Sequence, residues 1–242
     1  MKTLWFGRKW QWFLASLLLV ELAAGGANPA PPAPLPFSVG VAKANITPAY
    51  PIRLTGYVVR KTEMEGVEQA LWAKALAIAL GTNPPVVLVT VDNCGLGAKM
   101  VEALAATLKA KAGLERERLA VCSTHTHAGP CTVGFAPNIF AQDLAAGQLA
   151  AIERYTRELA TKLENLVLEA TRQRRSARLA WCQGQVNFAA NRRTPGGPVD
   201  HFLPLLCAFD DQGKPLALLL NYACHCTTLG GQFNKCHGDW AG

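Results

Sequence analysis

The chain has 242 residues, of which 50% are hydrophobic and 17% are charged, and its formal net charge is +7. This length can form one sizeable α/β domain with a buried core, and the composition excludes an intrinsically disordered chain. The sequence has no basic helix, lysine run or patch of basic residues with interleaved aromatics, so we do not expect nucleic-acid binding.

Residues 1–27 are predicted to be a signal peptide. A positively charged start precedes a short apolar stretch, FLASLLLV at residues 13–20, and small residues follow it. This stretch is too short to cross a bilayer, which takes about 20 helical residues. We therefore expect an exported protein, periplasmic or secreted, with an uncleaved anchor as the alternative. The prolines in residues 28–36 predict an extended tether, because proline lacks the amide donor that helices and central strands need.

Residues 37–242 are predicted to form one domain in which strands and helices alternate. Strands are expected at 37–42, 71–80, 86–91, 118–123, 177–183, 203–209 and 216–222. Apolar residues recur at helical spacing over residues 100–108, and Gly113 predicts the end of that helix. A second, longer helix is expected around residues 152–167.

This order of elements predicts the α/β fold class, with a largely parallel or mixed sheet and helices packed on it. Such sheets place ligand sites beyond the carboxyl ends of their strands, where we expect a metal site. The eight cysteines of an exported chain are compatible with disulfides or with free thiols, and both alternatives stay open.

Histidines follow two of the predicted strands. His125 and His127 come after residues 118–123 in THTHAGP, and His225 comes after residues 216–222 in ACHCTT. A His-x-His pair in an extended chain directs both rings to the same side, and neutral imidazole is the commonest zinc ligand. Histidines at the ends of two separate strands predict a zinc site. A hydrogen-bonded pair of polar residues is the alternative for His125 and His127.

Other candidates are weaker. Thiol ligation by Cys131, Cys224 or Cys226 is less favoured, because structural zinc sites usually show a Cys-x-x-Cys spacing. Asp92 ends a predicted buried strand, where an aspartate most often caps the following turn. His201 is expected at the surface. His237 and Asp239 are expected in an ordinary loop, with a position of Asp239 near the site as the less favoured alternative.

Several stretches of the domain resemble the N-terminal domain of the neutral/alkaline non-lysosomal ceramidases and occur in the family's order. They are VGVAKANITP at 39–48, LTGY at 54–57, VVLVTVD at 86–92, STHTHAGP at 123–130, NRR at 191–193, GPVD at 197–200 and NYACHCTTLG at 221–230. Any one of these stretches alone is a moderate or weak signal, whereas STHTHAGP with NYACHCTTLG at this separation is a strong combined signal.

The resemblance implies a zinc-dependent amidohydrolase that cleaves the N-acyl bond of ceramide to sphingosine and a fatty acid. It implies that His125 and His225 bind Zn²⁺ and that His127 faces the substrate and assists catalysis. It also implies that Arg192 contacts the substrate and that Gly56 lies near the substrate head group. The implied partner is a lipid-like amide substrate, and contact with a membrane surface is a further expectation.

The chain departs from the family pattern at Cys226, where the family typically has proline, and in NRRT, where it has NRSP. The remaining family zinc ligands, a glutamate and a tyrosine, belong to a region beyond Gly242. We therefore expect a domain that is incomplete at its C-terminus, binds zinc weakly and shows little activity by itself. A zinc hydrolase of the same fold acting on another amide or ester, or an inactive truncated binding domain, are the alternatives.

Overall fold

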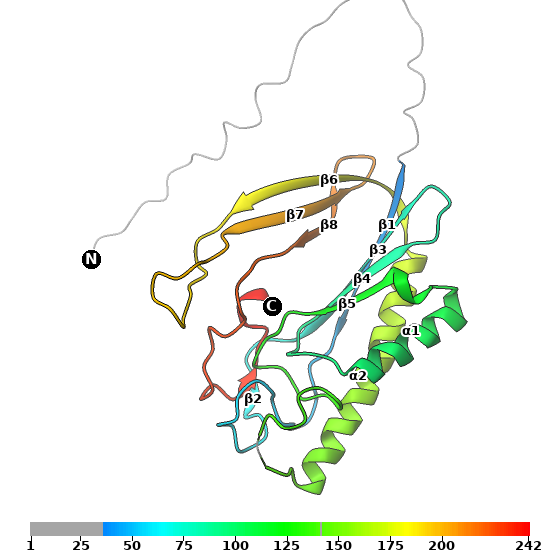
Figure 1. The fold of residues 1–242 in the computed structure, drawn as a ribbon. Helices are drawn as coiled ribbons and strands as arrows, with labels where there is room; N and C mark the ends of the chain where they lie inside the picture. Colours follow the sequence, from blue (N-terminus) through cyan, green and yellow to red (C-terminus); the bar gives the residue numbers. More distant parts are fainter. Residues whose placement is uncertain (1–35, 141) are drawn as a thin grey trace, which may run out of the picture. The chain divides into compact units, whose positions relative to one another are not determined.

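The computed structural model describes residues 36–140 and 142–242, so the predicted signal peptide and nearly all of the predicted tether lie outside the described residues. Seven strands form one sheet in the order β5-β4-β3-β1-β6-β7-β8, with two helices (Figure 1). The strands are β1 (Phe37–Asn45), β3 (Trp72–Leu80), β4 (Val86–Val91), β5 (Leu119–Ser123), β6 (Arg175–Gln185), β7 (Phe202–Phe209) and β8 (Pro215–Leu220). The helices are α1 (Ala98–Ala112) and α2 (Ala146–Arg172).

The shorter elements lie in the connections. The strands β2 (Gly66–Val67) and β9 (Lys235–Cys236) pair with each other in a separate two-stranded sheet. Two 3₁₀ turns, η1 (Arg116–Arg118) and η2 (Asp239–Ala241), precede β5 and end the chain. The predicted helices and main-sheet strands are all present with bounds shifted by a few residues, whereas β2 and β9 were not predicted.

The sheet is mixed and mostly antiparallel, so the expectation of a largely parallel sheet was wrong. Within the described sheet, β4–β5 is the one parallel pair. A parallel pair needs a long crossover connection, and α1 supplies one between β4 and β5. The links from β3 to β4 and from β7 to β8 are tight turns, and α2 leads into β6, which runs antiparallel to β1. The alternation of strand and helix signals in a sequence does not distinguish parallel from antiparallel pairing of the strands.

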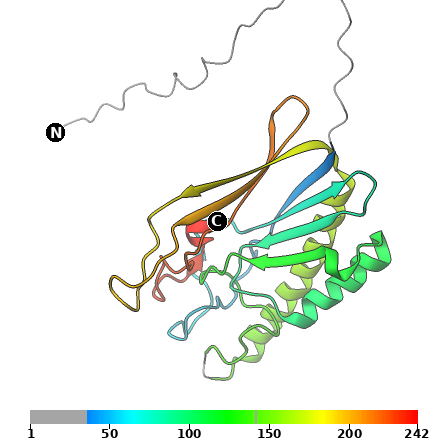
Figure 2. The ribbon, with the colours of Figure 1, turned by 45° about the horizontal axis from the view of Figure 1, so that its top comes forward.

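The long helix α2 packs on one face of β1 and β3, as Figures 1 and 2 show. Its apolar stripe includes Leu159 and Leu163, which are buried in the main core together with the small residues of β3. The backbone of α2 approaches β1 so closely that a Cβ atom at Gly40 would lie 1.9 Å from the carbonyl oxygen of Ala170. Small residues on this face of the sheet therefore set the distance between helix and sheet.

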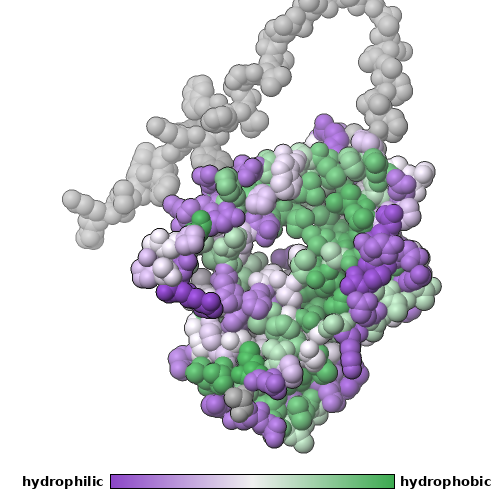
Figure 3. Space-filling model, in the orientation of Figure 1, coloured by the Kyte–Doolittle hydropathy of each residue, from purple (hydrophilic) through white to green (hydrophobic). Residues whose placement is uncertain are grey.

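The three strands β6, β7 and β8 are much less covered. Large apolar side chains remain exposed there, including Trp181 at 68% and Leu218 at 59%. Figure 3 shows a continuous apolar area in the upper right of the molecule, whereas the surface in its upper left, where β6 and β7 lie in Figure 1, is mixed. Among the described residues, neither helix combines the length and apolarity that a membrane crossing requires. All eight cysteines lie in the described part of the chain and are free thiols.

Replacement of Gly40 by alanine is expected to lower the free energy of unfolding by about 1–3 kcal/mol, because the added methyl group would push α2 away from β1. Gly147→Ala is the matched control, since Gly147 lies in the first turn of α2 with nothing within 4 Å of an added Cβ. Urea unfolding followed by circular dichroism measures both variants. Equal stability of the two variants would contradict the close-packing argument.

Candidate metal centre

Three histidine rings meet at the ends of β5 and β8. The Nε2 atom of His127 lies 3.3 Å from Nε2 of His125 and 3.0 Å from Nε2 of His225. The rings of His125 and His225 are stacked with their centroids 4.9 Å apart. His125 and His225 are exposed, whereas His127 is half-buried between them. The structure thus brings together the three histidines singled out in the sequence, and their roles stay predictions.

The local backbone differs from the extended His-x-His geometry expected from the sequence. His125 has φ +63°, in the left-handed region that residues other than glycine rarely adopt. The rings of His125 and His127 are therefore nearly perpendicular, at 77°, rather than side by side. Between them, the fully buried Thr126 donates a hydrogen bond from Oγ1 to the carbonyl oxygen of His237 at 2.7 Å. Such strain persists only when surrounding contacts determine it, and it concentrates at functional sites.

Backbone hydrogen bonds join the three loops that carry the site. The amide of Thr55 donates to the carbonyl of Gly129 at 3.0 Å, and the amide of Cys131 donates to Arg53 at 2.9 Å. On the other side, the amide of His127 donates to the carbonyl of Cys226 at 3.3 Å. The loop after β5 is therefore held between the loop after β1 and the loop after β8.

A buried arginine, Arg60, fastens the same loops through its side chain. It is 4% exposed and donates to the carbonyl oxygens of Thr55 at 2.7 Å, Phe233 at 2.8 Å and His127. Among the described residues, no carboxylate forms an ion pair with it. Carbonyl dipoles thus solvate this charge, and the His127 backbone is held as a result. Sequence reasoning missed Arg60, because no pattern marks a single buried arginine.

Gly56 and Tyr57 enclose the His127 ring. A Cβ atom at Gly56 would lie 2.5 Å from both Cβ and Cγ of His127, and Gly56 has φ +100°. The Tyr57 ring meets the His127 ring edge-on at a centroid distance of 5.0 Å, and its hydroxyl donates to the carbonyl of Leu229 at 2.9 Å. Gly56 therefore lies against His127, and a side chain at position 56 would displace the imidazole ring of His127.

Burial and neighbouring rings lower the pKa values of two of the three histidines, His127 and His225. Burial, and then the rings of His225 and His125, lower the pKa of His127 to about 4. Burial and the His125 ring also lower the pKa of His225. His127 is consequently neutral at pH 7, which leaves ring nitrogens with lone pairs available for a proton or a cation.

The donor set fits Zn²⁺. The carbonyl oxygen of Cys94 lies 2.5 Å from Nδ1 of His125; because a carbonyl can only accept, Nδ1 carries the proton and Nε2 keeps its lone pair. Two imidazole nitrogens on one tetrahedral zinc, each about 2.0–2.1 Å from the ion, lie about 3.3 Å apart. The Nε2 atom of His127 lies at spacings of 3.3 and 3.0 Å, close to this value, from Nε2 of His125 and of His225. The stacked rings of His125 and His225 have their centroids 4.9 Å apart. In addition, Cys94, His125 and His127 each place one ligand atom within 4.8 Å of the others.

Arg192 lies beside the cluster. Its Nη1 atom donates to Oγ1 of Thr227 at 3.2 Å, and its charge contributes to the lowered pKa of His225, after burial and His125. Its guanidinium is exposed, so it can bind a polar group of a ligand that approaches the histidines.

Asp239 organises the loop that carries His225. Its Oδ1 atom accepts from the amide and hydroxyl of Thr228 at 3.3 and 2.6 Å, and its Oδ2 atom accepts from the amide of Leu229 at 3.1 Å. Burial raises the pKa of Asp239, but these hydrogen bonds outweigh burial and hold it below the usual value. Both oxygens of the Asp239 carboxylate are therefore used to hold the loop that carries His225, and we do not assign Asp239 as a metal ligand.

The other candidates do not join the cluster. Asp92 accepts a hydrogen bond from the amide of Trp72 at 2.9 Å and holds the start of β3. His201 is exposed at the start of β7, as expected. Cys131 and Cys226 are buried, and neither belongs to the metal-capable group found among the described residues.

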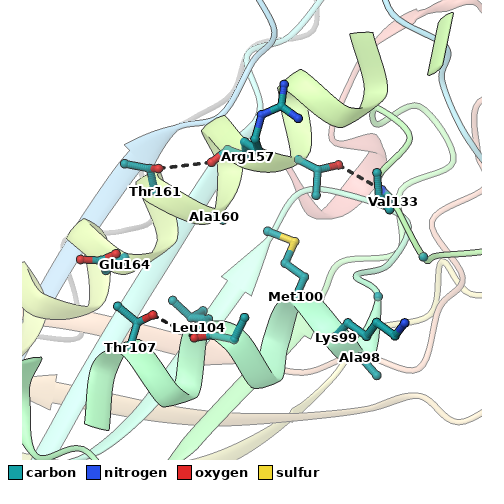
Figure 4. A pocket seen from close by; sticks show the side chains of 14 residues that line it. Ala98, Lys99, Met100, Leu104, Thr107, Val133, Arg157, Ala160, Thr161 and Glu164 are labelled. Carbon is teal, nitrogen blue, oxygen red and sulfur yellow. Dashed lines mark hydrogen bonds between the residues drawn. The ribbon is translucent and has the colours of Figure 1, made fainter. Parts of the chain in front are cut away.

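A separate cavity of about 660 Å³ lies between α1 and α2 (Figure 4). Met100 and Leu104 of α1 and Ala160 of α2 line it, with Arg157 and Glu164 also among its residues. It shares no residue with the histidine cluster, so its size does not bear on the metal centre.

Gly56→Ala is expected to weaken Zn²⁺ binding at least tenfold, because the new methyl group would push the His127 ring against His125 and His225, whose Nε2 atoms lie 3.3 and 3.0 Å from its own. Gly81→Ala is the control: Gly81 also has a left-handed φ, of +55°, but an added Cβ there meets nothing within 4 Å. Zinc affinity is measured by competition with a chromophoric chelator. If both variants bind zinc equally well, the close contact has no role in the site.

Asp239→Ala is expected to weaken zinc binding about tenfold by releasing Thr228 and Leu229, and with them the position of His225. Asp210→Ala is the matched control, because Asp210 likewise accepts hydrogen bonds from loop amides, those of Gln212 and Lys214, but in the β7–β8 turn. The same chelator competition applies. Unchanged affinity in Asp239→Ala would exclude this positioning role.

Known ceramidases share this sequence pattern and this fold. Residues 37–242 match the family model described as neutral/alkaline non-lysosomal ceramidase, N-terminal. No curated protein sequence matches the chain. A ceramidase complexed with C2 superposes with a TM-score of 0.70 at 20% identity, over 84% of this chain and 33% of that chain. The neutral ceramidase from Pseudomonas aeruginosa superposes with a TM-score of 0.69 at 20% identity, over 84% of this chain and 34% of that chain.

At this level of identity the solved structures show the fold alone, and the chain spans about a third of their length. The family model, by contrast, matches most of the chain. The chain therefore belongs to the neutral/alkaline non-lysosomal ceramidase family and carries its N-terminal domain.

Proposed function

We propose that this protein is a zinc-dependent amidohydrolase that cleaves the N-acyl bond of ceramide, giving sphingosine and a fatty acid. The observation that carries the proposal is the convergence of three imidazole Nε2 atoms in a domain of the ceramidase family. Because the chain spans a third of the length of the solved ceramidases, the activity, the substrate and the zinc are all part of the proposal.

In this proposal His125 and His225 hold the zinc. When bound, zinc supplies Lewis acidity toward the amide carbonyl and toward the attacking water. The carbonyl of Cys94 fixes the proton of His125 on Nδ1, which directs the Nε2 lone pair into the site. His125 is further fixed by its strained backbone, and His225 by the loop that Asp239 organises.

His127 is placed to move protons. Its lowered pKa leaves the ring neutral at pH 7, so it can accept a proton from water at Nε2 and return it to the leaving amine. Gly56 and Tyr57 prevent the ring from rotating away, and Arg60 holds the backbone carbonyl of the same residue. The exposed Arg192 is assigned to the polar part of the substrate, next to the metal.

A lipid-like amide is the proposed substrate, and an exported location, periplasmic or secreted, is proposed with it. Exposed apolar side chains on β6 and β8, such as Trp181 and Leu218, support contact with a lipid surface. The chemistry of the cluster would serve other amides and esters equally well, so the substrate has to be determined by assay.

His125→Ala is expected to lower kcat/KM for a fluorescent N-acyl-sphingosine at least 100-fold, because the variant loses a metal ligand. The assay uses the zinc-loaded protein. His201→Ala is the control, because His201 is exposed and takes no part in the cluster.

The possible results separate the proposed function from its alternatives. Zinc-dependent turnover that is lost in His125→Ala and retained in His201→Ala supports the proposal. Turnover of other amides or esters without ceramide cleavage would contradict the substrate and indicate a different hydrolase of the same fold. Zinc binding without turnover of any of these substrates would contradict the enzyme assignment and leave a binding domain.

A further inference from the structure

We propose that a groove between the two halves of the main sheet binds a fatty acid. The carboxylate lies between Lys43 and Lys74, and the hydrocarbon chain lies on aliphatic side chains of β1, β3, β4 and β8. The groove shares no residue with the histidine cluster. The inference goes beyond the proposed function, because binding in this groove needs neither a metal nor turnover.

The groove exists because the sheet opens at β1. This strand pairs with β3 over its full length, Phe37–Asn45, but with β6 only over Phe37–Val39. Beyond Val39 the strands β6, β7 and β8 therefore diverge from the other four, as Figures 1 and 2 show. A groove of about 520 Å³ remains, with β1, β3 and β4 on one side and β8 on the other.

Aliphatic side chains line most of this groove. They are Val41, Leu76, Leu88, Leu216 and Leu218. Val41 is 38% exposed and Leu218 is 59% exposed, so an apolar ligand would remove their surface from water. The continuous apolar area in the upper right of Figure 3 lies where β1 and β8 diverge in Figure 1.

Two lysines lie directly opposite each other at one end of the groove. Lys43 and Lys74 are register partners in the antiparallel β1–β3 pair, and Thr90, the partner of Lys74 on β4, adds a hydroxyl group to the same end. Like charges in such positions repel each other, because cross-strand Cβ atoms lie about 4.5–5.5 Å apart. A carboxylate bound between the two ammonium groups would offset this repulsion.

No carboxylate of the described chain already fills this role. Among the described residues, neither Lys43 nor Lys74 forms an ion pair. Glu169 of α2 is the one acidic residue in the lining, and its carboxylate accepts a hydrogen bond from the side-chain amide of Gln173 at 2.9 Å. The two lysines are therefore available to an anionic ligand.

The size of the groove suits a single hydrocarbon chain. Its volume of about 520 Å³ falls in the range of small-molecule sites. An adjoining depression lined by Val39 and Val41 extends it along β1, so the lining runs from Lys43 to Val39, about 13 Å at about 3.3 Å per residue. Strands on both sides exclude a bilayer. A fatty acid, which is also the acid product of the proposed reaction, matches both the apolar lining and the charged end.

The test measures binding of decanoate and of decanol, which has the same chain without the charge, by titration calorimetry. Lys43→Gln combined with Lys74→Gln is expected to weaken decanoate binding at least tenfold and to leave decanol binding unchanged. Leu218→Asn should weaken the binding of both ligands. Leu220→Asn is its matched control, because Leu220 lies on the same strand and is 45% exposed but does not line the groove.

The other outcomes overturn the inference and leave the proposed function to its own assay. Equal decanoate affinity of the double lysine variant and the wild type, or no binding by the wild type, would exclude the site. Loss of binding in Lys99→Gln would place the ligand in the cavity between α1 and α2 instead. Loss in His125→Ala would place the carboxylate at the metal centre. A dimer in sedimentation that Leu218→Asn dissociates would make a second copy of the chain the occupant.

Discussion

The candidate site depends on the hydrogen bonds that the buried guanidinium of Arg60 donates to backbone carbonyl groups. A charge that is 4% exposed, without a carboxylate partner among the described residues, is tolerated only when strong acceptors surround it. Here those acceptors are carbonyl groups of three separate loops, at Thr55, His127 and Phe233. The need to solvate one cation therefore fixes the loops relative to one another, and it fixes the backbone of His127 directly.

Around this anchor the site is organised before any ligand arrives. His125 is held at a φ of +63°, and His127 is pressed against Gly56, where an added carbon atom would lie 2.5 Å away. Asp239 adopts a φ of +60° and accepts hydrogen bonds from the loop that carries His225. Local strain at these positions is compensated by the surrounding hydrogen bonds, as is usual for preorganised sites.

The main sheet contributes to the site through β4 and β5, the one parallel pair among its described strands. Antiparallel hairpins send the chain back along the sheet, whereas the crossover through α1 returns it to the same edge. Because of that connection, the segments after β4 and β5 lie side by side, and Cys94 reaches His125. The close packing of α2 on Gly40 and the alanines of β3 supports these strands from one face.

Sequence alone determined most of the elements and singled out the residues that meet at the candidate site. Runs such as 86–91 and the helical spacing of residues 100–108 reflect local patterning, which a sequence displays directly. The resemblance in STHTHAGP and NYACHCTTLG identified the family that the family model shows. Histidines at two strand ends suggested that the rings converge. Because β5 and β8 are the opposite outer strands of the sheet, it is the loops after them, joined by the hydrogen bond from the His127 amide to the Cys226 carbonyl, that bring the rings together.

Tertiary structure decided what depends on contacts between distant segments. Strand direction in the sheet was one such property, because alternating strands and helices are compatible with parallel and antiparallel pairing alike. The positions of Arg60 and Cys94 were another, since burial and hydrogen bonding of a single side chain leave no periodic signal. The left-handed backbone at His125 likewise arises from its surroundings, which no local pattern around THTH encodes.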